Sequence, residues 1–221
     1  MGKRGPKPKG LVKIAWSENF AYAIGLLVSD GNLSPNGRHI VFVSKDLELI
    51  ELFQKALGIN IHIGVKSNGY VKGRRYHVVQ FSDVLFYKFL LDIGLMPNKS
   101  KIIGKVLIPD KYFVDFLRGE FDGDGCTHSY FDTRWKSSFM FYTIFASASP
   151  DYIKWLQGRI FEHLSIKGHV TGTQEKCLQL KYAKNESLIL LRAMYHKKTV
   201  LALSRKRLKI EEMLRIIGQR L

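Results

Sequence analysis

Two short stretches of this sequence share the pattern Gly-x-x-x-x-Asp-Gly: Ala23-Ile-Gly-Leu-Leu-Val-Ser-Asp-Gly31 and Leu117-Arg-Gly-Glu-Phe-Asp-Gly-Asp-Gly125. In both, small residues recur four positions apart, at Ala21, Gly25 and Ser29 in the first and at Gly119 and Gly123 in the second. Four residues are about one turn of an α-helix, so each stretch predicts a helix with a bare stripe along one side. Two bare stripes allow two helix backbones to approach unusually closely. We therefore expect the two helices to pack side by side.

An aspartate ends each stretch, Asp30 in the first and Asp124 in the second. Side-by-side helices would bring both carboxylates to their C-terminal tips, where the helix dipoles add partial negative charge. Such a cluster is costly unless a cation joins it, and carboxylate oxygens favour magnesium or calcium. A single Asp-Gly after a helix is usually only a stop and a turn. Two matching copies favour the metal site.

The order of expected elements repeats along the chain. The unit is α-β-β-α-β-β-α, and it occurs twice. Matching markers are Gly31 with Gly125, Ser44-Lys-Asp46 with Ser149-Pro-Asp151, and Leu90-Leu91 with Leu190-Leu191, at spacings of 94, 105 and 100. The prediction is an α+β fold with two halves about a pseudo-two-fold axis. Its parts are a basic N-terminal arm at 1–16, a first half at 17–97, a linker at 98–110 and a second half at 111–221.

The spacing of apolar residues and the positions of helix-capping residues predict where each helix and strand begins and ends. In the first half we expect helices at 17–29, 46–57 and 82–94 and strands at 38–44, 61–66 and 76–81. In the second half we expect helices at 111–123, 149–164 and 185–195 and strands at 139–147, 169–173 and 178–181. Gly31 and Gly125 stand where a left-handed residue would stop each first helix.

A formal net charge of +16 indicates a polyanionic partner. Hydrophobic residues make up 46% of the chain, which fills a core, and no apolar run approaches the roughly 18 residues of a membrane span. Nucleic acid is the favoured partner, and a membrane surface is the alternative. The membrane hypothesis would need the tail helix at 204–217, whose apolar residues Leu208, Met213, Leu214 and Ile217 are better explained as a core-facing stripe. Cys126 and Cys177 share no metal-ligand spacing and predict reduced thiols in an intracellular protein.

The repeated stretches resemble the two copies of the motif that names the LAGLIDADG homing endonucleases. The resemblance runs from about Ser17 onward and includes the later signatures Leu95-Met-Pro-Asn-Lys-Ser100 and Leu203-Ser-Arg-Lys206. Two motifs in one chain imply the single-chain members, which act as monomers on non-palindromic DNA. The resemblance implies two antiparallel sheets that form a saddle on double-stranded DNA, with the motif helices between them. It also implies a metal-dependent double-strand break.

The resemblance also implies roles for particular residues. The final acids Asp30 and Asp124 would bind the metal, helped by the carbonyls of Ser29 and Gly123. The metal would be Mg²⁺; Mn²⁺ would substitute for it, and Ca²⁺ would bind without supporting cleavage. Glu120 and Asp122 do not match the ligand position. Lys206 and Lys99 would stand near the scissile phosphates, with a solvated helix surface as the alternative for each.

Basic residues on the expected strands and hairpins are the candidate DNA contacts. They are Arg38, Lys45, Lys66, Lys72, Arg74, Arg75, Tyr76, Arg134, Lys136, Lys176 and Lys181. For any one of them, a phosphate contact or simple solvation is the alternative to base recognition.

The ends of the chain lack intein splicing residues, which favours a free-standing, intron-encoded enzyme. The expected compartment is the cytoplasm or nucleoid of a prokaryote, with an organelle matrix as the alternative. The alternative functions are an RNA maturase that binds intron RNA and a DNA-binding protein without cleavage.

Overall fold

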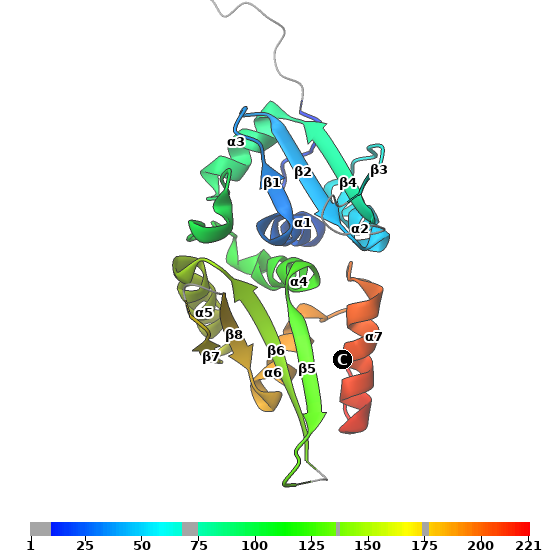
Figure 1. Ribbon diagram of the computed structural model, residues 1–221, viewed down its shortest axis with the longest axis vertical. Helices are drawn as coiled ribbons and strands as arrows, with labels where there is room; N and C mark the ends of the chain where they lie inside the picture. The colour runs from blue at the N-terminus through cyan, green and yellow to red at the C-terminus, as the bar shows by residue number, and fades with distance from the viewer. Residues whose placement is uncertain (1–9, 68–74, 136–137, 174–176) are drawn as a thin grey trace, which may run out of the picture.

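Two similar halves stack against each other in the computed structural model, which describes residues 10–67, 75–135, 138–173 and 177–221 (Figure 1). Helices α1 and α4 lie side by side between the two sheets. One sheet is above this helix pair and the other is below it in Figure 1. The arrangement follows from the repeated order of elements, since each half contributes one helix to the centre and one sheet to the outside.

The elements keep the same order in both halves. The first half contains α1 (Glu18–Ser29), β1 (Gly31–Leu33), β2 (His39–Ser44), α2 (Leu47–Leu57), β3 (Gly64–Ser67), β4 (Arg75–Ser82) and α3 (Val84–Asp92). The second contains α4 (Phe113–Gly123), β5 (Cys126–Phe131), β6 (Phe139–Ser147), α5 (Pro150–Leu164), β7 (His169–Thr171), β8 (Leu178–Tyr182) and α6 (Lys184–Met194). Two short 3₁₀ helices, η1 (Lys99–Lys101) and η2 (Asp110–Tyr112), lie between the halves, and α7 (Ser204–Ile216) follows the second.

Each sheet has four antiparallel strands. The strand orders are β1-β2-β4-β3 and β5-β6-β8-β7, so each new hairpin adds beside the second strand of the previous one. One face of each sheet is buried; Phe42 and Val79 pair on that face in the first, and Phe145 and Leu180 in the second. This confirms the predicted α+β class and the duplicated unit. The sequence did not locate β1, which spans only three residues, or β5.

Side-chain caps begin several helices as predicted. The Ser17 hydroxyl accepts from Phe20 N at 3.1 Å, and the Ser149 hydroxyl accepts from Tyr152 N at 3.4 Å. Asp83 caps α3 through Phe86 N at 2.9 Å and also accepts from Leu11 N and Val12 N. The last two bonds hold the described end of the N-terminal segment against the first half.

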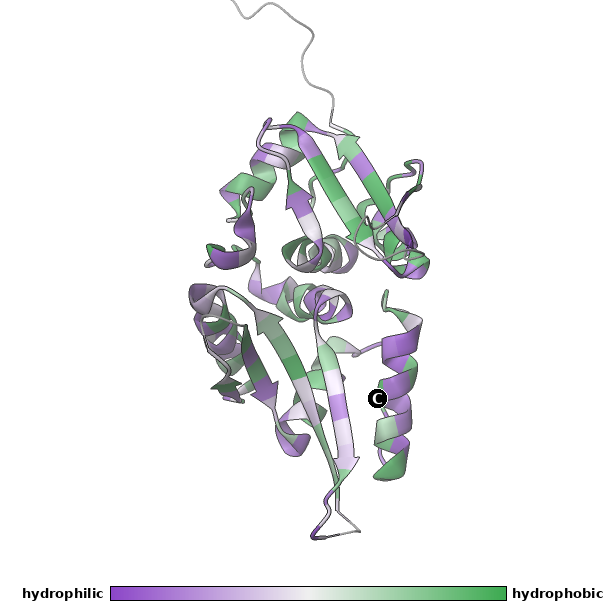
Figure 2. Ribbon diagram, in the orientation of Figure 1, coloured by the Kyte–Doolittle hydropathy of each residue, from purple (hydrophilic) through white to green (hydrophobic). Residues whose placement is uncertain are grey.

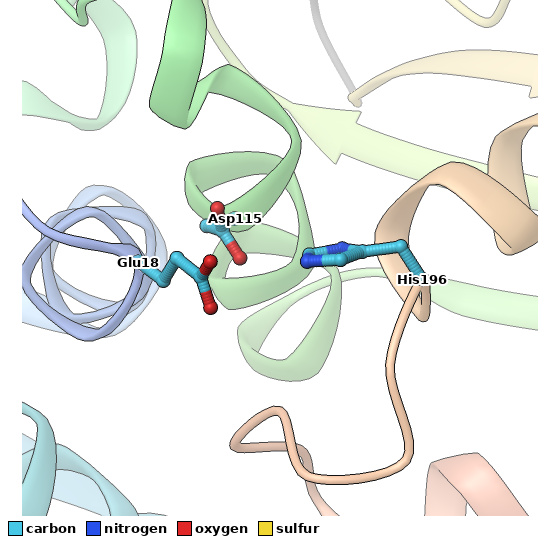
Figure 3. Close-up of side chains that lie close together, drawn as sticks. All are labelled: Glu18, Asp115 and His196. Carbon is cyan, nitrogen blue, oxygen red and sulfur yellow. The ribbon is translucent and has the colours of Figure 1, made fainter.

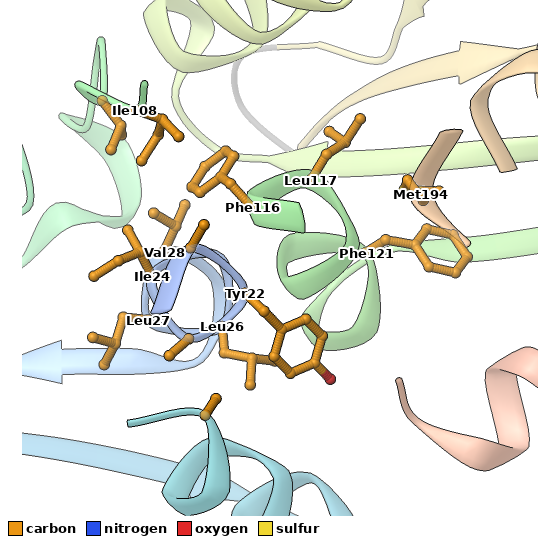
Figure 4. Close-up of a cluster of buried hydrophobic side chains, with 14 of the residues drawn as sticks. Tyr22, Ile24, Leu26, Leu27, Val28, Ile108, Phe116, Leu117, Phe121 and Met194 are labelled. Atoms are coloured by element: carbon orange, nitrogen blue, oxygen red, sulfur yellow. The ribbon is translucent and has the colours of Figure 1, made fainter. Parts of the chain in front are cut away.

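The central helices are in backbone contact, as the small-residue stripes predict. A Cβ on Gly25 would overlap Phe116 O, and a Cβ on Gly119 would overlap Tyr22 O. Large side chains such as Ile24, Phe116 and Phe121 point away from this contact into the core of each half (Figure 4). Only glycine permits such an approach, so the stripe sets the distance between the halves.

Gly31 and Gly125 do not have the expected left-handed conformation. Neither has a positive φ; Asp30 and Asp124 cap α1 and α4 with right-handed geometry. Instead, a Cβ on Gly31 would clash with the backbone of Leu27, and one on Gly125 with that of Phe121. These glycines are needed because the strand turns back closely over its own helix.

Two further details differ from the sequence-based expectation. The helix caps Asp46 and Ser149 occupy matching positions, so α2 and α5 are 103 residues apart rather than 105. Leu208 in α7 is 64% exposed, whereas Ile210 is buried with Met213 and Leu214. Met213, Leu214 and Ile217 thus lie against the core as predicted, and only Leu208 does not. Hydrophilic and hydrophobic residues both occur along α7 (Figure 2).

Candidate functional site

Asp30 and Asp124 are brought together at the C-terminal tips of the central helices. Each is the residue that ends its helix, and each donates its backbone N–H four residues back, to Leu26 O at 3.0 Å and to Glu120 O at 3.1 Å. A Cβ on Gly123 would lie 3.3 Å from Asp30 Oδ2 and would overlap the Ser29 hydroxyl. The bare stripe therefore also gives the Asp30 side chain its place beside α4.

The surroundings of both carboxylates disfavour their charged form. Burial and then repulsion from Asp124 raise the pKa of Asp30 to about 6, although Lys206 and Lys99 oppose the rise. Burial also raises the pKa of Asp124, against the same two lysines. Both groups are therefore held where their charge is costly, which is the condition that a bound cation relieves.

The two lysines predicted to stand near the scissile phosphates bind the helix ends in matching ways. Lys99 Nζ donates to Gly31 O and, at 3.4 Å, to Ser29 O. Lys206 Nζ donates to the corresponding oxygens of Gly125 at 2.6 Å and Gly123 at 3.0 Å, and also to Phe121 O. Both side chains are nearly buried, so the solvated-surface alternative does not describe them.

These lysines neutralise the carbonyl ends of α1 and α4. Burial lowers the pKa of Lys206 to about 8 and also lowers that of Lys99. The Ser29 and Gly123 carbonyls, the expected metal ligands, thus already accept a hydrogen bond each. A carbonyl oxygen has two lone pairs, so one remains on each for a cation.

Two hollows flank the aspartates, one beside each sheet. The β2 hollow is lined by Asp30, Asp124, Gly123, Asp46, Arg205, Tyr76, Leu49 and the end of β2 at 43–45. The β6 hollow is lined by Asp124, Glu120, Tyr152, Lys99, Ser100, Ile103, Val28, Ser29 and the end of β6 at 146–148. Each hollow lies between the tips of the central helices and the end of a strand, β2 in one half and β6 in the other. The two hollows are therefore related in the same way as the two halves.

Asp122 is a structural acid. It is fully buried on α4 and accepts hydrogen bonds from Tyr22 Oη at 2.8 Å, Leu203 N at 2.7 Å and Tyr195 Oη at 3.4 Å. The bond to Leu203 fixes the chain just before α7, which carries Lys206. Asp122 therefore positions Lys206.

A salt bridge that sequence reasoning missed joins the halves at the β2 hollow. Arg205 donates to Asp46 Oδ2 from Nη2 at 2.6 Å and from Nε at 2.9 Å. Beside it, Ser204 N donates to Glu48 Oε1 at 3.0 Å. The signature Leu203-Ser-Arg-Lys206 contained Arg205, but its partner lies 159 residues away and could not be read from the sequence.

The open sheet faces carry some of the candidate DNA contacts. In the first sheet Lys66 pairs with Tyr76, and the Lys45 ammonium lies 5.6 Å from the Tyr76 ring centre. In the second sheet Lys181 pairs with Ile144 and His169.

Other candidates are separate from these groups. Arg75 alternates with Tyr76 and so faces the other side of its strand. Arg38 precedes the outer end of β2, and Arg134 is exposed in the β5–β6 connection. Lys72, Arg74, Lys136 and Lys176 lie outside the described residues.

Three ligand-type side chains also meet at the opposite, N-terminal ends of the central helices. Glu18, Asp115 and His196 point toward one another from α1, α4 and the segment after α6 (Figure 3). Lys197 already pairs with Glu18 at 2.6 Å, and buried Arg118 pairs with Asp115 at 2.8 Å. The acids thus have partners, and acidic residues in a first helical turn stabilise the helix.

The same architecture occurs in solved structures. The homing endonuclease I-WcaI bound to its DNA recognition sequence matches with a TM-score of 0.63 and 14% identity, over 91% of this chain and 88% of that one. I-LtrWI, bound to target DNA, matches with a TM-score of 0.58 and 12% identity, over 91% and 90%. The chain has the LAGLIDADG fold. Neither a protein-family model nor a curated protein matches the sequence.

The LAGLIDADG fold is not confined to proteins named as endonucleases. Full-length DUF199/WhiA from Thermatoga maritima matches with a TM-score of 0.57 and 18% identity over 94% of this chain, which spans 63% of the WhiA chain. A variant of I-DmoI with its target DNA and Mn, and I-DmoI with DNA and Ca, match at TM-scores of 0.51 and 0.52 and at 14% and 11% identity, each over more than 80% of both chains. At these identities the comparisons show a shared fold. Among the described residues, no helix combines the length and apolar character needed to cross a bilayer.

Proposed function

We propose that this LAGLIDADG protein is a site-specific DNA endonuclease that depends on a divalent metal ion. The observation that carries the proposal is the pair of aspartates at the helix tips, held together between two hollows and left with unfavourable charge. Two scissile phosphates on opposite strands need two such positions about one axis. The net charge of +16 supplies the attraction for the DNA backbone.

Asp30 and Asp124 would hold the metal, with the free lone pairs of the Ser29 and Gly123 carbonyls as further oxygen ligands. A bound divalent cation would lower the pKa of a water molecule and stabilise charge on the phosphate oxygens. Mg²⁺ is the expected ion, with Mn²⁺ as a substitute and Ca²⁺ as a ligand that does not support cleavage.

The lysines have an electrostatic role in this proposal. Lys99 and Lys206 lie against the helix ends, so their charges are fixed close to both aspartates. Fixed positive charge at that place would stabilise a phosphate in either hollow without the need for side-chain movement. Arg205 and Lys45 line the β2 hollow and would contact the DNA backbone beside that hollow.

The second candidate is DNA binding without cleavage. The observation that favours it is the similarity to DUF199/WhiA, which has an N-terminal LAGLIDADG domain and is not named as an endonuclease. Intron RNA remains a further predicted partner.

The experiment selects DNA first and tests cleavage second. Random double-stranded DNA would be bound to the protein in Ca²⁺, recovered, and then exposed to Mg²⁺ with sequencing of any new ends. We expect cuts on both strands at one recurring site and none with Asp30→Asn. Selected DNA that stays intact in both Mg²⁺ and Mn²⁺ would establish the binding protein instead.

A further inference from the structure

The two hollows at the helix tips are lined by different side chains. The central helices are related by a spacing of 94 residues, so the counterpart of Glu120 is Leu26. Helices α2 and α5 are related by 103 residues, so the counterpart of Tyr152 is Leu49. The second half thus has a carboxyl and a phenol where the first half has two leucines.

The Glu120 carboxyl is buried, and one of its oxygens has no hydrogen-bond partner of good geometry in the described part of the chain. Its side chain is 4% exposed and lines the β6 hollow, and its Oε2 makes no hydrogen bond within the described residues. Tyr152 Oη beside it also has no partner of good geometry there, although it is close enough to Glu120 for each group to shift the pKa of the other. A buried polar group without a partner is costly, and natural structures rarely keep one without a reason.

The environment of Glu120 also disfavours its charge. Burial raises the pKa of its carboxyl to about 8, the Tyr152 hydroxyl opposes that rise, and Asp124 adds to it. A polar occupant of the hollow would satisfy both unpaired groups.

The hollow fits a small hydrated cation. Its volume of about 110 Å³ is well above the roughly 10–15 Å³ that one water molecule needs by the same measure, so it accommodates an ion with several water molecules. Asp124 and Glu120 are four residues apart on α4, so their Cβ atoms are about 6 Å apart on one helix face. Two carboxylates that line one hollow are the donors that hard divalent cations prefer.

Positive charge is also present at the hollow, on a lysine that partly offsets the charge of Asp124 and is hydrogen-bonded to helix carbonyls. Lys99 lines the hollow, and its Nζ donates to the Ser29 and Gly31 carbonyls. A water molecule alone would satisfy hydrogen bonds but would not stabilise the charged form of Glu120, which burial and Asp124 disfavour. A cation would do both.

We propose that the β6 hollow is a divalent-cation site of its own, formed by Asp124 and Glu120, for which the first half has no counterpart. The inference rests on the proposed function in taking Asp124 as a metal ligand. Both donors come from the same helix, so the site exists before DNA binds.

The test is calorimetric titration of Ca²⁺ into the full chain without DNA. The wild-type protein should bind one ion, and both Glu120→Gln and Asp124→Asn should lower the affinity at least tenfold. Glu120→Leu copies the first half and removes the unpaired carboxyl, so it is the second variant should the amide disturb the fold. Glu212→Gln, on the exposed surface of α7, is the matched control and should bind as the wild type does. A thermal melt of each variant confirms that it is folded.

The outcomes separate this inference from the proposed function. No Ca²⁺ binding in the DNA-free wild-type protein would overturn the inference, as would loss of binding with Asp124→Asn while both Glu120 variants bind normally. In either case, metal-dependent DNA cleavage could still be observed and the proposed function would stand. Conversely, Ca²⁺ binding that depends on Glu120 in a protein that cuts no DNA would keep the inference and reject the endonuclease.

Discussion

Replacement of Asp30 by asparagine should make the protein more stable and inactive at the same time. Burial and the nearby Asp124 carboxylate raise the pKa of Asp30 to about 6 from an ordinary value of 3.8. That difference corresponds to roughly 3 kcal/mol of unfavourable free energy when the group is charged, at about 1.4 kcal/mol for each pH unit. Asparagine keeps the shape and removes the charge. We expect a gain of about 1–3 kcal/mol in the free energy of unfolding at neutral pH.

The gain should depend on pH in one direction. Between about pH 4 and pH 6 the folded wild-type protein holds a proton on Asp30 that the unfolded chain has released. The stability of the wild type therefore falls as pH rises through this window, while the Asp30→Asn variant lacks this contribution. The two proteins should converge below about pH 4 and differ most above about pH 6.

Urea unfolding of both proteins at several pH values, without divalent metal, measures the effect. Asp92→Asn, at the exposed end of α3, is the control and should not change stability. Added Mg²⁺ should stabilise the wild type more than Asp30→Asn, because the cation relieves the same repulsion. A variant that is less stable than the wild type at neutral pH, or a difference that is constant with pH, would refute this account of the helix tips.

Three further results are expected. Gly25→Ala should destabilise the fold by about 1–3 kcal/mol or more, because its Cβ would overlap the backbone oxygen of Phe116. Thermal unfolding measures this loss, and a variant as stable as the wild type would contradict the close helix contact. Asp122→Asn should lower both stability and the cleavage rate, because the bond that fixes Leu203 ahead of Lys206 is weakened; normal cleavage by a destabilised variant would limit Asp122 to a structural role. Affinity for the selected DNA should fall by about 10³–10⁵ between 50 and 200 mM salt if roughly 6–10 phosphates are contacted, whereas a flat response in binding assays would show that the basic charge lies elsewhere.

The central helix pair could be predicted from sequence because its constraint is local. Glycines one turn apart make a flat helix surface in any context, and the pattern Gly-x-x-x-x-Asp-Gly then carries the acid to the helix end. The structure confirms the stripes at Gly25 and Gly119 and the duplicated α+β order. The same reasoning failed at Gly31, where a glycine after a helix suggested a left-handed stop. The actual requirement is room for β1 to turn back over Leu27, which depends on three-dimensional contact.

The arrangement around the acids was less accessible to sequence reasoning because its contacts cross long separations. Lys206 reaches the Gly123 carbonyl across 83 residues, and Arg205 reaches Asp46 across 159. Neither spacing has a periodicity that a sequence pattern can reveal. The resemblance to LAGLIDADG proteins placed Lys99 and Lys206 near the centre, but only the folded chain places both ammonium groups against helix carbonyls.

The close contact between the central helices also determines which positions can differ between the two halves. Gly25 and Gly119 are fixed because the backbones of α1 and α4 meet there, and Gly123 is fixed because the Ser29 side chain occupies the place of a Cβ. Positions 26 and 28 in α1, and 120 and 122 in α4, instead carry side chains, and that of Asp122 bonds to Tyr22 of the other half. Leu26 and Val28 are apolar, whereas Glu120 and Asp122 are acids, and Asp122 is fully hydrogen-bonded while Glu120 is not. A duplicated fold can thus keep a symmetric contact between its helices and still acquire an asymmetric site one helical turn away, as the unpaired Glu120 indicates.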